Sequence, residues 1–464
     1  MEIFLQMQIQ AVIDIYVEFI ILFSCYPYFM DSTIFINPVL ISIILLCVLC
    51  LCKVNVLLSI MISAITAGIC AKMNITDVMN VFISGMGNNS ETALSYILLG
   101  AFAAAMTQTG LANILAKKIT SLIKNNSIIL FAILTVIAML SQNLIPVHIA
   151  FIPILIPPLL QVMNLLKIDR RAVSCCLAFG LKMPYIVIPA GFGLIFQGLI
   201  ADNIVQNGMD IAKTDVWKYN TILGLGMFIA LLVAIFITYR KPREYKDIEV
   251  KIKEETSTKF TKEHYITLFA AFATLFIQLA TKSLPLGALV GLGIIFGTGT
   301  IKHQKMDNLI DEGVGLMGYI AFVMLVAAGF AAVLKSTGGI ETFVTTVMSL
   351  LPDSKVIASA LMLFIGLFIT IGIGTSFGTI PILAVIFVPV CVSLNFSPAE
   401  TIVILSAAAA LGDAGSPASD TTLGPTSGLN ADGQHNHIWD TCVPSFIHFN
   451  TALILSALIA ILIF

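Results

Sequence analysis

Long apolar segments recur along the whole chain of 464 residues, and most of them carry no charged side chain. A helix of about 20 apolar residues crosses the hydrocarbon core of a bilayer, which is about 30 Å thick. The apolar runs are continuous and do not alternate with polar residues, which excludes a transmembrane β-barrel. With 58% hydrophobic and 11% charged residues, the chain also lies outside the range of soluble proteins. The sequence therefore predicts an all-α polytopic protein of the cell (plasma) membrane.

The chain contains an internal duplication. The stretch GMGNNSETALSYILLGAFAAAMTQTG (85–110) aligns with GVGLMGYIAFVMLVAAGFAAVLKSTG (313–338), and eight positions are identical at a constant offset of 228 residues. The same register holds from about residue 36 to about residue 200, which indicates two related halves. Each half holds seven apolar segments. Because seven is odd, the second half must enter the membrane from the opposite side.

The positively charged residues favour the same inverted arrangement. Short cytoplasmic loops are enriched in Lys and Arg, and most of the 24 Lys and Arg residues lie in alternate loops of this chain. We therefore expect two inverted-topology repeats of about seven segments each with discontinuous helices, an architecture typical of secondary transporters. The expected division is an N-terminal extension or extra helix (1–33), a first transmembrane repeat (34–239), a solvated cytoplasmic linker (240–263) and a second transmembrane repeat (264–464).

Gly and Pro residues interrupt the sixth apolar segment of each half. In the first half, Lys182 lies eleven residues after Arg171, about 16 Å along a helix and so near the middle of the membrane. In the second half, LGDAGSPASDTTLGP (411–425) places Asp413 and Asp420 at a similar depth. Irregular backbone at such depth is tolerated only where it is buried in protein or lines a cavity. Charged side chains there are costly and indicate a functional site.

Carboxylates, hydroxyls and freed carbonyls are hard oxygen ligands, which suit Na⁺ or protons better than zinc or copper. We therefore predict a midplane cation site, with Na⁺ held by Asp413 and Asp420. Lys182 is expected either to pair with Asp413 in the ion-free state or to receive the carboxylate of a substrate. Breaks in SQNLIPVH (141–148) and GIGTSFGTIP (372–381) supply further candidate residues, namely Gln142, Asn143, His148, Thr375, Ser376 and Thr379.

The block GDAGSPASDTT (412–422) resembles the G-D-x-x-S-P-x-S-D-T-T signature of NhaC-type Na⁺/H⁺ antiporters, which are inverted-repeat carriers of the ion transporter superfamily. The resemblance extends over nearly all of the chain from Asn37 onward. The downstream sequence GPTSGLNADGQHNHIWD (424–440) departs from the typical pattern and resembles an antiporter-like subgroup suspected of carrying amino acids. The signature implies a role in the ion and substrate path for Asp413, Ser416, Pro417, Ser419, Asp420, Thr421 and Thr422.

Two transport functions stay open at this stage. One is Na⁺/H⁺ antiport by alternating access around the cation site, and the other is Na⁺- or H⁺-coupled transport of an amino acid. A channel would need a path open from both sides, and an enzyme would need an activated nucleophile for which the sequence offers no arrangement. We expect Na⁺ and/or H⁺ as coupling ion with no other cofactor, and a small ion or amino acid as substrate. The expected surroundings are the lipid bilayer, without nucleic acid, and the architecture allows a homodimer.

Overall fold

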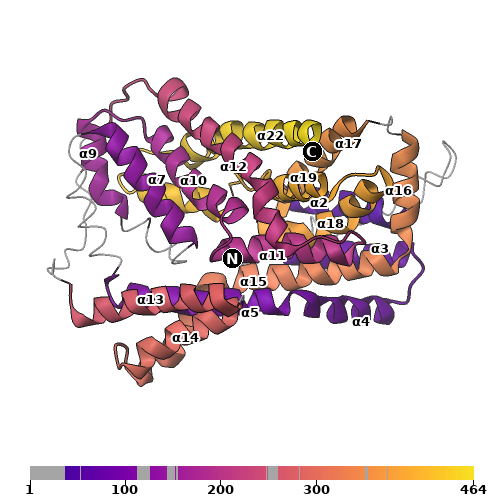
Figure 1. Ribbon diagram of the computed structural model, residues 1–464, viewed down its shortest axis with the longest axis horizontal. Coiled ribbons are helices and arrows are strands. Elements are labelled where there is room, and N and C mark those ends of the chain that lie inside the picture. The colour runs from indigo at the N-terminus through magenta and orange to yellow at the C-terminus, as the bar shows by residue number, and fades with distance from the viewer. Residues whose placement is uncertain are drawn as a thin grey trace, which may run out of the picture.

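The computed structural model describes residues 37–52, 54–111, 126–143, 152, 155–246, 248, 260–281, 283–350, 354–373, 375–417 and 419–464. Every regular element in these ranges is a helix (Figure 1). Five of the described helices are long and apolar enough to cross a membrane, and a bent pair, α10 with α11, forms a sixth candidate span. The predicted all-α polytopic fold is confirmed. The N-terminal segment 1–33 and His148 lie outside the described residues.

The described helices of the two halves follow one another in the same order and at the offset found in the sequence. Four pairs begin 228 residues apart: α3 and α14, α7 and α17, α10 and α19, and α11 and α20. The first half contains α2 (Pro38–Leu51), α3 (Val56–Cys70), α4 (Ile75–Met86), α5 (Ser90–Gln108), α7 (Ser127–Asn143), α9 (Leu160–Leu165), α10 (Arg170–Val187), α11 (Phe192–Gln206) and α12 (Val216–Val233). The second half contains α13 (Lys262–Thr281), α14 (Leu284–Gly297), α15 (Met306–Ser336), α16 (Gly339–Leu350), α17 (Lys355–Ile373), α18 (Ser376–Ser393), α19 (Pro398–Ala410), α20 (Asp420–Leu429), η6 (His437–Cys442), α21 (Val443–Ser445), η7 (Phe446–Asn450) and α22 (Thr451–Ile463).

The long helix α15 lies along α4 and α5 and joins the two halves (Figure 1). The backbone at Gly85 lies against Gly329, and the backbone at Gly313 lies against Ala101, so the helices run antiparallel. Exchanging each residue for its equivalent 228 positions away converts the first contact into the second. Such reciprocal contacts are what a two-fold relation between the halves requires. The inverted orientation of the repeats in a membrane stays a prediction.

Close approach of the helices at Gly313 leads to a first testable prediction. A Cβ atom at this position would lie 2.4 Å from the backbone nitrogen of Ala101, whereas a Cβ at Gly315 would meet no atom within 4 Å. Because forcing atoms into a packed interface costs about 1–3 kcal/mol or more, we expect Gly313→Val to lower the unfolding temperature of the purified protein. Gly315→Val is the matched control and should unfold like the parent. Equal unfolding temperatures for both variants would contradict the packing of α5 on α15.

A buried ion pair ties the start of α10 to the loop after α20. Arg170 Nη1 and Nη2 donate to the two carboxylate oxygens of Asp432 at 2.7 Å and 2.6 Å. The ring of Tyr245 from the linker lies 4.2 Å from the guanidinium carbon, and the Arg243 backbone N–H donates to the Lys167 carbonyl at 3.0 Å. The linker was predicted to be a solvated connector, but its described part packs on this pair because Tyr245 stacks on the buried guanidinium.

Candidate functional site

The break between α19 and α20 depends on two glycines with positive φ. Gly412 has φ +79° and Gly415 has φ +107°, a region that residues with a Cβ rarely adopt. A Cβ would also lie 2.6 Å from the Leu367 carbonyl oxygen at the first position and 2.6 Å from Phe446 Cα at the second. Asn450 stabilises the break by accepting from the Gly412 N–H at 3.1 Å. The sequence therefore ends α19 here and turns the chain inside the protein.

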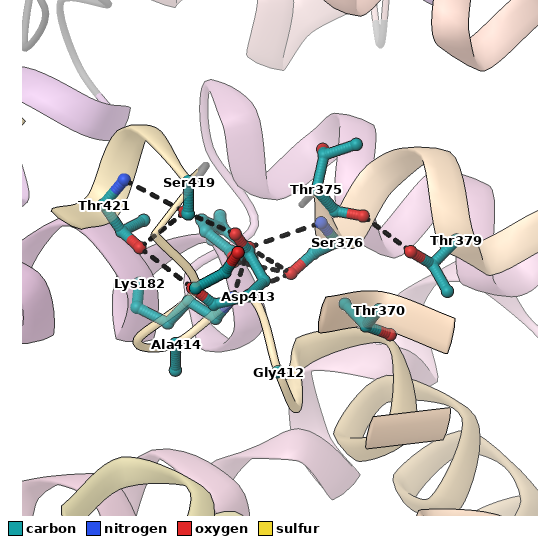
Figure 2. Close-up of polar contacts among 12 residues, drawn as sticks. Lys182, Thr370, Thr375, Ser376, Thr379, Gly412, Asp413, Ala414, Ser419 and Thr421 are labelled. Carbon is teal, nitrogen blue, oxygen red and sulfur yellow. Dashed lines mark hydrogen bonds and ion pairs between the residues drawn. The ribbon is translucent and has the colours of Figure 1, made fainter. Parts of the chain in front are cut away.

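Asp413 lies within this break and forms a buried ion pair with Lys182 of α10 (Figure 2). The residues are 4% and 1% exposed. Lys182 Nζ contacts Asp413 Oδ2 and also donates to Ser376 Oγ at 2.8 Å. A charge in the protein interior is tolerated when it is paired and its remaining hydrogen-bonding capacity is satisfied. Of the two roles predicted for Lys182, the structure contains the pairing with Asp413.

Hydroxyl groups complete the surroundings of the carboxylate. Ser376 donates from Oγ to Asp413 Oδ2 at 2.6 Å and from its backbone N–H at 3.3 Å. Ser419 Oγ donates to Oδ1 at 2.5 Å, and the Tyr185 hydroxyl donates to Oδ2 at 3.4 Å. Figure 2 shows these groups converging on Asp413 from the first residues of α18 and from the segment just before α20. Both carboxylate oxygens therefore have protein partners in this conformation.

A cavity of about 20 Å³ lies beside the ion pair, and both Asp413 and Asp420 line it. This volume is close to the minimum needed to hold one water molecule, so it suits a single small ion and is too small for an amino acid. Thr375, Thr421 and Gln142 also line the cavity. Asp420 is the first residue of α20, where the helix dipole stabilises a negative charge.

The other residues predicted for the site have different positions. Thr421 Oγ1 donates to the Asp413 carbonyl at 3.3 Å, close to the carboxylate. Thr422 Oγ1 donates to the Ser416 carbonyl at 2.5 Å and supports the backbone of the break. Asn143 is the last residue of α7, and the position of its side chain is not described. The structure thus gathers most of the candidates around Asp413, and their role in ion binding stays a prediction.

Sequence reasoning did not single out Tyr185, although a signal was present. Tyr185 lies 228 residues before Asp413 and is therefore its equivalent in the first half. Its ring packs on Phe377 and Phe196, with centroids 5.0 Å and 5.1 Å away, and Phe377 also contacts Tyr96 and Phe192 at 5.8 Å and 5.9 Å. These five rings form an aromatic cluster beside the ion pair.

A second, larger cavity of about 590 Å³ is lined by neighbouring residues of the same segments, and we call it the vestibule. Ser95 and Pro189 line the vestibule, whereas Tyr96 and Phe192 line the small cavity. The vestibule wall also carries two acidic side chains, Glu91 and Asp202. Its volume lies in the usual range for small-molecule sites, about 300–1,000 Å³.

Comparison with known proteins agrees with this site. The sequence model of the Na⁺/H⁺ antiporter family matches residues 176–460, which include both discontinuous helices and the signature. The chain belongs to the Na⁺/H⁺ antiporter family. A second Na⁺-H⁺ antiporter family model matches residues 37–123. The resemblance found in the sequence is therefore confirmed.

Individual relatives of this antiporter family match over nearly the whole chain. A membrane protein of Vibrio parahaemolyticus is 46% identical over 439 residues, covering 92% of this chain and 100% of the relative. YuiF of Bacillus subtilis, named as a proposed amino acid transporter, is 44% identical over 442 residues, covering 92% of this chain and 100% of YuiF.

Two solved transporter structures share the fold. The YdaH transporter of Alcanivorax borkumensis aligns with a TM-score of 0.57 at 12% identity, covering 83% of this chain and 88% of YdaH. MtrF of Neisseria gonorrhoeae, described as illuminating a class of antimetabolite efflux pumps, aligns with a TM-score of 0.52 at 15% identity, covering 83% and 84%. Together with the family, these structures identify a secondary transporter in a multi-pass membrane fold.

Proposed function

We propose that this protein exchanges Na⁺ for H⁺ at the Asp413–Asp420 site. The observation that supports this function most is the charge of the small cavity. Two carboxylates line it and one ammonium, Lys182, pairs with one of them, so these three groups carry a net charge of −1. One monovalent cation, either Na⁺ or H⁺, makes the group neutral.

Neutrality explains why the two ions would alternate. Moving an uncompensated charge through the low-dielectric centre of a membrane protein is costly. The conformational change that moves access from one face to the other is therefore favoured when one cation is bound. Release on one side and capture of the other ion on the opposite side give exchange, and the discontinuous helices α10–α11 and α19–α20 supply the moving contacts.

Lys182 has two roles in this scheme. Its ammonium compensates Asp413, which prevents a second monovalent cation or a divalent ion from satisfying the site. It also competes with the transported ion for the oxygens of Asp413, because Lys182 Nζ contacts the same carboxylate atom as Ser376. This competition keeps ion binding weak enough for release.

A second candidate is cation-coupled transport of an amino acid. The vestibule of about 590 Å³ is large enough for such a substrate, and its carboxylates Glu91 and Asp202 suit an ammonium group. The name of YuiF points the same way. In this version the small cavity holds the coupling ion and the vestibule receives the amino acid.

Flux measurements in proteoliposomes separate the two candidates. Vesicles with an acidic interior and a trapped pH indicator receive external NaCl or choline chloride at equal ionic strength. We expect Na⁺, and not choline, to alkalinise the interior without any added amino acid. Proton movement that begins only when labelled amino acids are supplied, and that accompanies their uptake, would favour the second candidate. Neither ion movement nor amino acid uptake above empty vesicles would contradict both.

A further inference from the structure

Gln142 is a buried amide one residue before the end of α7 at Asn143. The residue is 4% exposed, and within the described part of the chain its Oε1 has no hydrogen-bond partner. A buried acceptor without a donor costs free energy, so such groups are rare and usually face a water molecule or ligand. Gln142 lines the same small cavity as Asp413 and Asp420.

The cavity therefore combines carboxylates with neutral oxygen atoms. Thr375 and Thr421 contribute hydroxyl-bearing side chains to its wall, and Gln142 contributes the amide. Hard cations favour such all-oxygen surroundings, whereas transition metals favour nitrogen or sulfur. Among the described residues no group of three or more His, Cys, Asp or Glu side chains could hold a metal ion, which argues against a transition-metal site.

Sodium and protons use these oxygens differently. A carboxylate can bind either a proton or a metal ion, but an amide oxygen is not protonated at physiological pH. Gln142 would therefore add little to a site that only takes up protons, and it would add a ligand to a site for a metal ion. The net charge of −1 on the three charged groups matches a monovalent ion, and a volume of about 20 Å³ admits an ion without its hydration shell.

We propose that Gln142 Oε1 is a ligand for an alkali metal ion, Na⁺, and that this residue determines the specificity of the site for Na⁺ over protons alone. The proposal deepens the exchange function proposed above and rests on it for its role in transport. The ion would lie in the small cavity, with Asp420 supplying negative charge and the wall hydroxyls supplying further oxygen atoms.

Ion-dependent unfolding of the purified full-length protein tests this proposal without any transport measurement. A ligand that binds only the folded state raises the unfolding temperature in a saturable way. We expect NaCl to stabilise the parent protein relative to choline chloride at equal ionic strength, with KCl less effective. In Gln142→Leu, which keeps the volume and removes the oxygen, the Na⁺ concentration for half of the effect should rise about 10- to 100-fold. The matched control is Ser141→Ala, which removes a hydroxyl bonded to the Ala138 carbonyl at 2.9 Å and should keep the parental response.

A second variant keeps the proposal testable if Gln142→Leu does not fold. Gln142→Glu keeps an oxygen and makes the three-group charge more negative by one unit, so we expect it to retain the Na⁺ response and to gain stabilisation by Ca²⁺. A merely structural role for Gln142 would not produce a new response to a divalent ion. An unchanged Na⁺ response in Gln142→Leu, or no Na⁺ response in the parent protein, would overturn the proposal.

The outcomes also separate this proposal from the exchange function. If Na⁺ stabilises the parent and not Gln142→Leu, but Na⁺ drives no proton movement in vesicles, the ion site stands and exchange is wrong. If exchange occurs and its Na⁺ dependence is the same in Gln142→Leu, exchange stands and the role of Gln142 is wrong.

Discussion

Asp413→Asn is expected to reduce gradient-driven transport to the level of empty vesicles. The substitution keeps the shape of the side chain and removes the charge that both Lys182 and the transported cation use. It also leaves a buried ammonium, with Lys182 1% exposed, without its counter-charge. Such a group must lose its proton or destabilise the fold. Flux in proteoliposomes and unfolding of the same purified variant measure the two consequences separately.

Removing both charges distinguishes transport from stability. The double variant Lys182→Met, Asp413→Asn contains no uncompensated charge at this position, so we expect it to unfold at a higher temperature than Asp413→Asn. It should still not transport, because the cation lacks the carboxylate. Asp215→Asn is a matched control, since it removes an exposed pair with Lys218 at 2.8 Å and should leave transport unchanged. Parental flux in Asp413→Asn would exclude this aspartate from the mechanism.

The second large effect is expected at the Arg170–Asp432 pair. The two side chains are 0% and 2% exposed, and Arg170 also donates to the Leu429 carbonyl at 3.0 Å and to Asn164 Oδ1 at 2.9 Å. Asp432→Ala leaves the guanidinium buried without a carboxylate. Losing one member of a buried pair costs about 3–5 kcal/mol, so the variant should unfold at a clearly lower temperature than the parent.

Two further variants define the cause of that loss. Arg170→Lys keeps the positive charge but cannot form two parallel hydrogen bonds to the carboxylate, so we expect it to be less stable than the parent. Glu244→Gln removes a salt bridge whose side chains are 57% and 79% exposed, and surface pairs contribute little. Its unfolding should match that of the parent. If Asp432→Ala and Glu244→Gln behaved alike, the buried pair would not stabilise the cytoplasmic end of α10.

Much of the site could be predicted because its signals are local. A lysine and an aspartate at membrane depth, each beside Gly and Pro, are visible in short stretches of sequence, and the repeat offset brings their two segments into correspondence. Ser376 was a candidate because it follows a break of its own. The hydrogen bonds that Ser376 and Ser419 make to Asp413 could not be predicted, since they depend on how the ends of three separate helices meet.

The sequence by itself determined the membrane class, the duplication and the interrupted segments. Hydrophobicity, residue identity at a fixed offset and the Gly and Pro positions act over a few residues or repeat in register, so no tertiary contact is needed to see them. The tertiary structure decided which groups share a cavity and which are buried. Gln142 faces Asp420 across 278 positions of chain, and Arg170 pairs with Asp432 beneath a tyrosine of the linker. Contacts over such separations depend on how whole helices pack, because every side chain in the interface contributes to the final geometry.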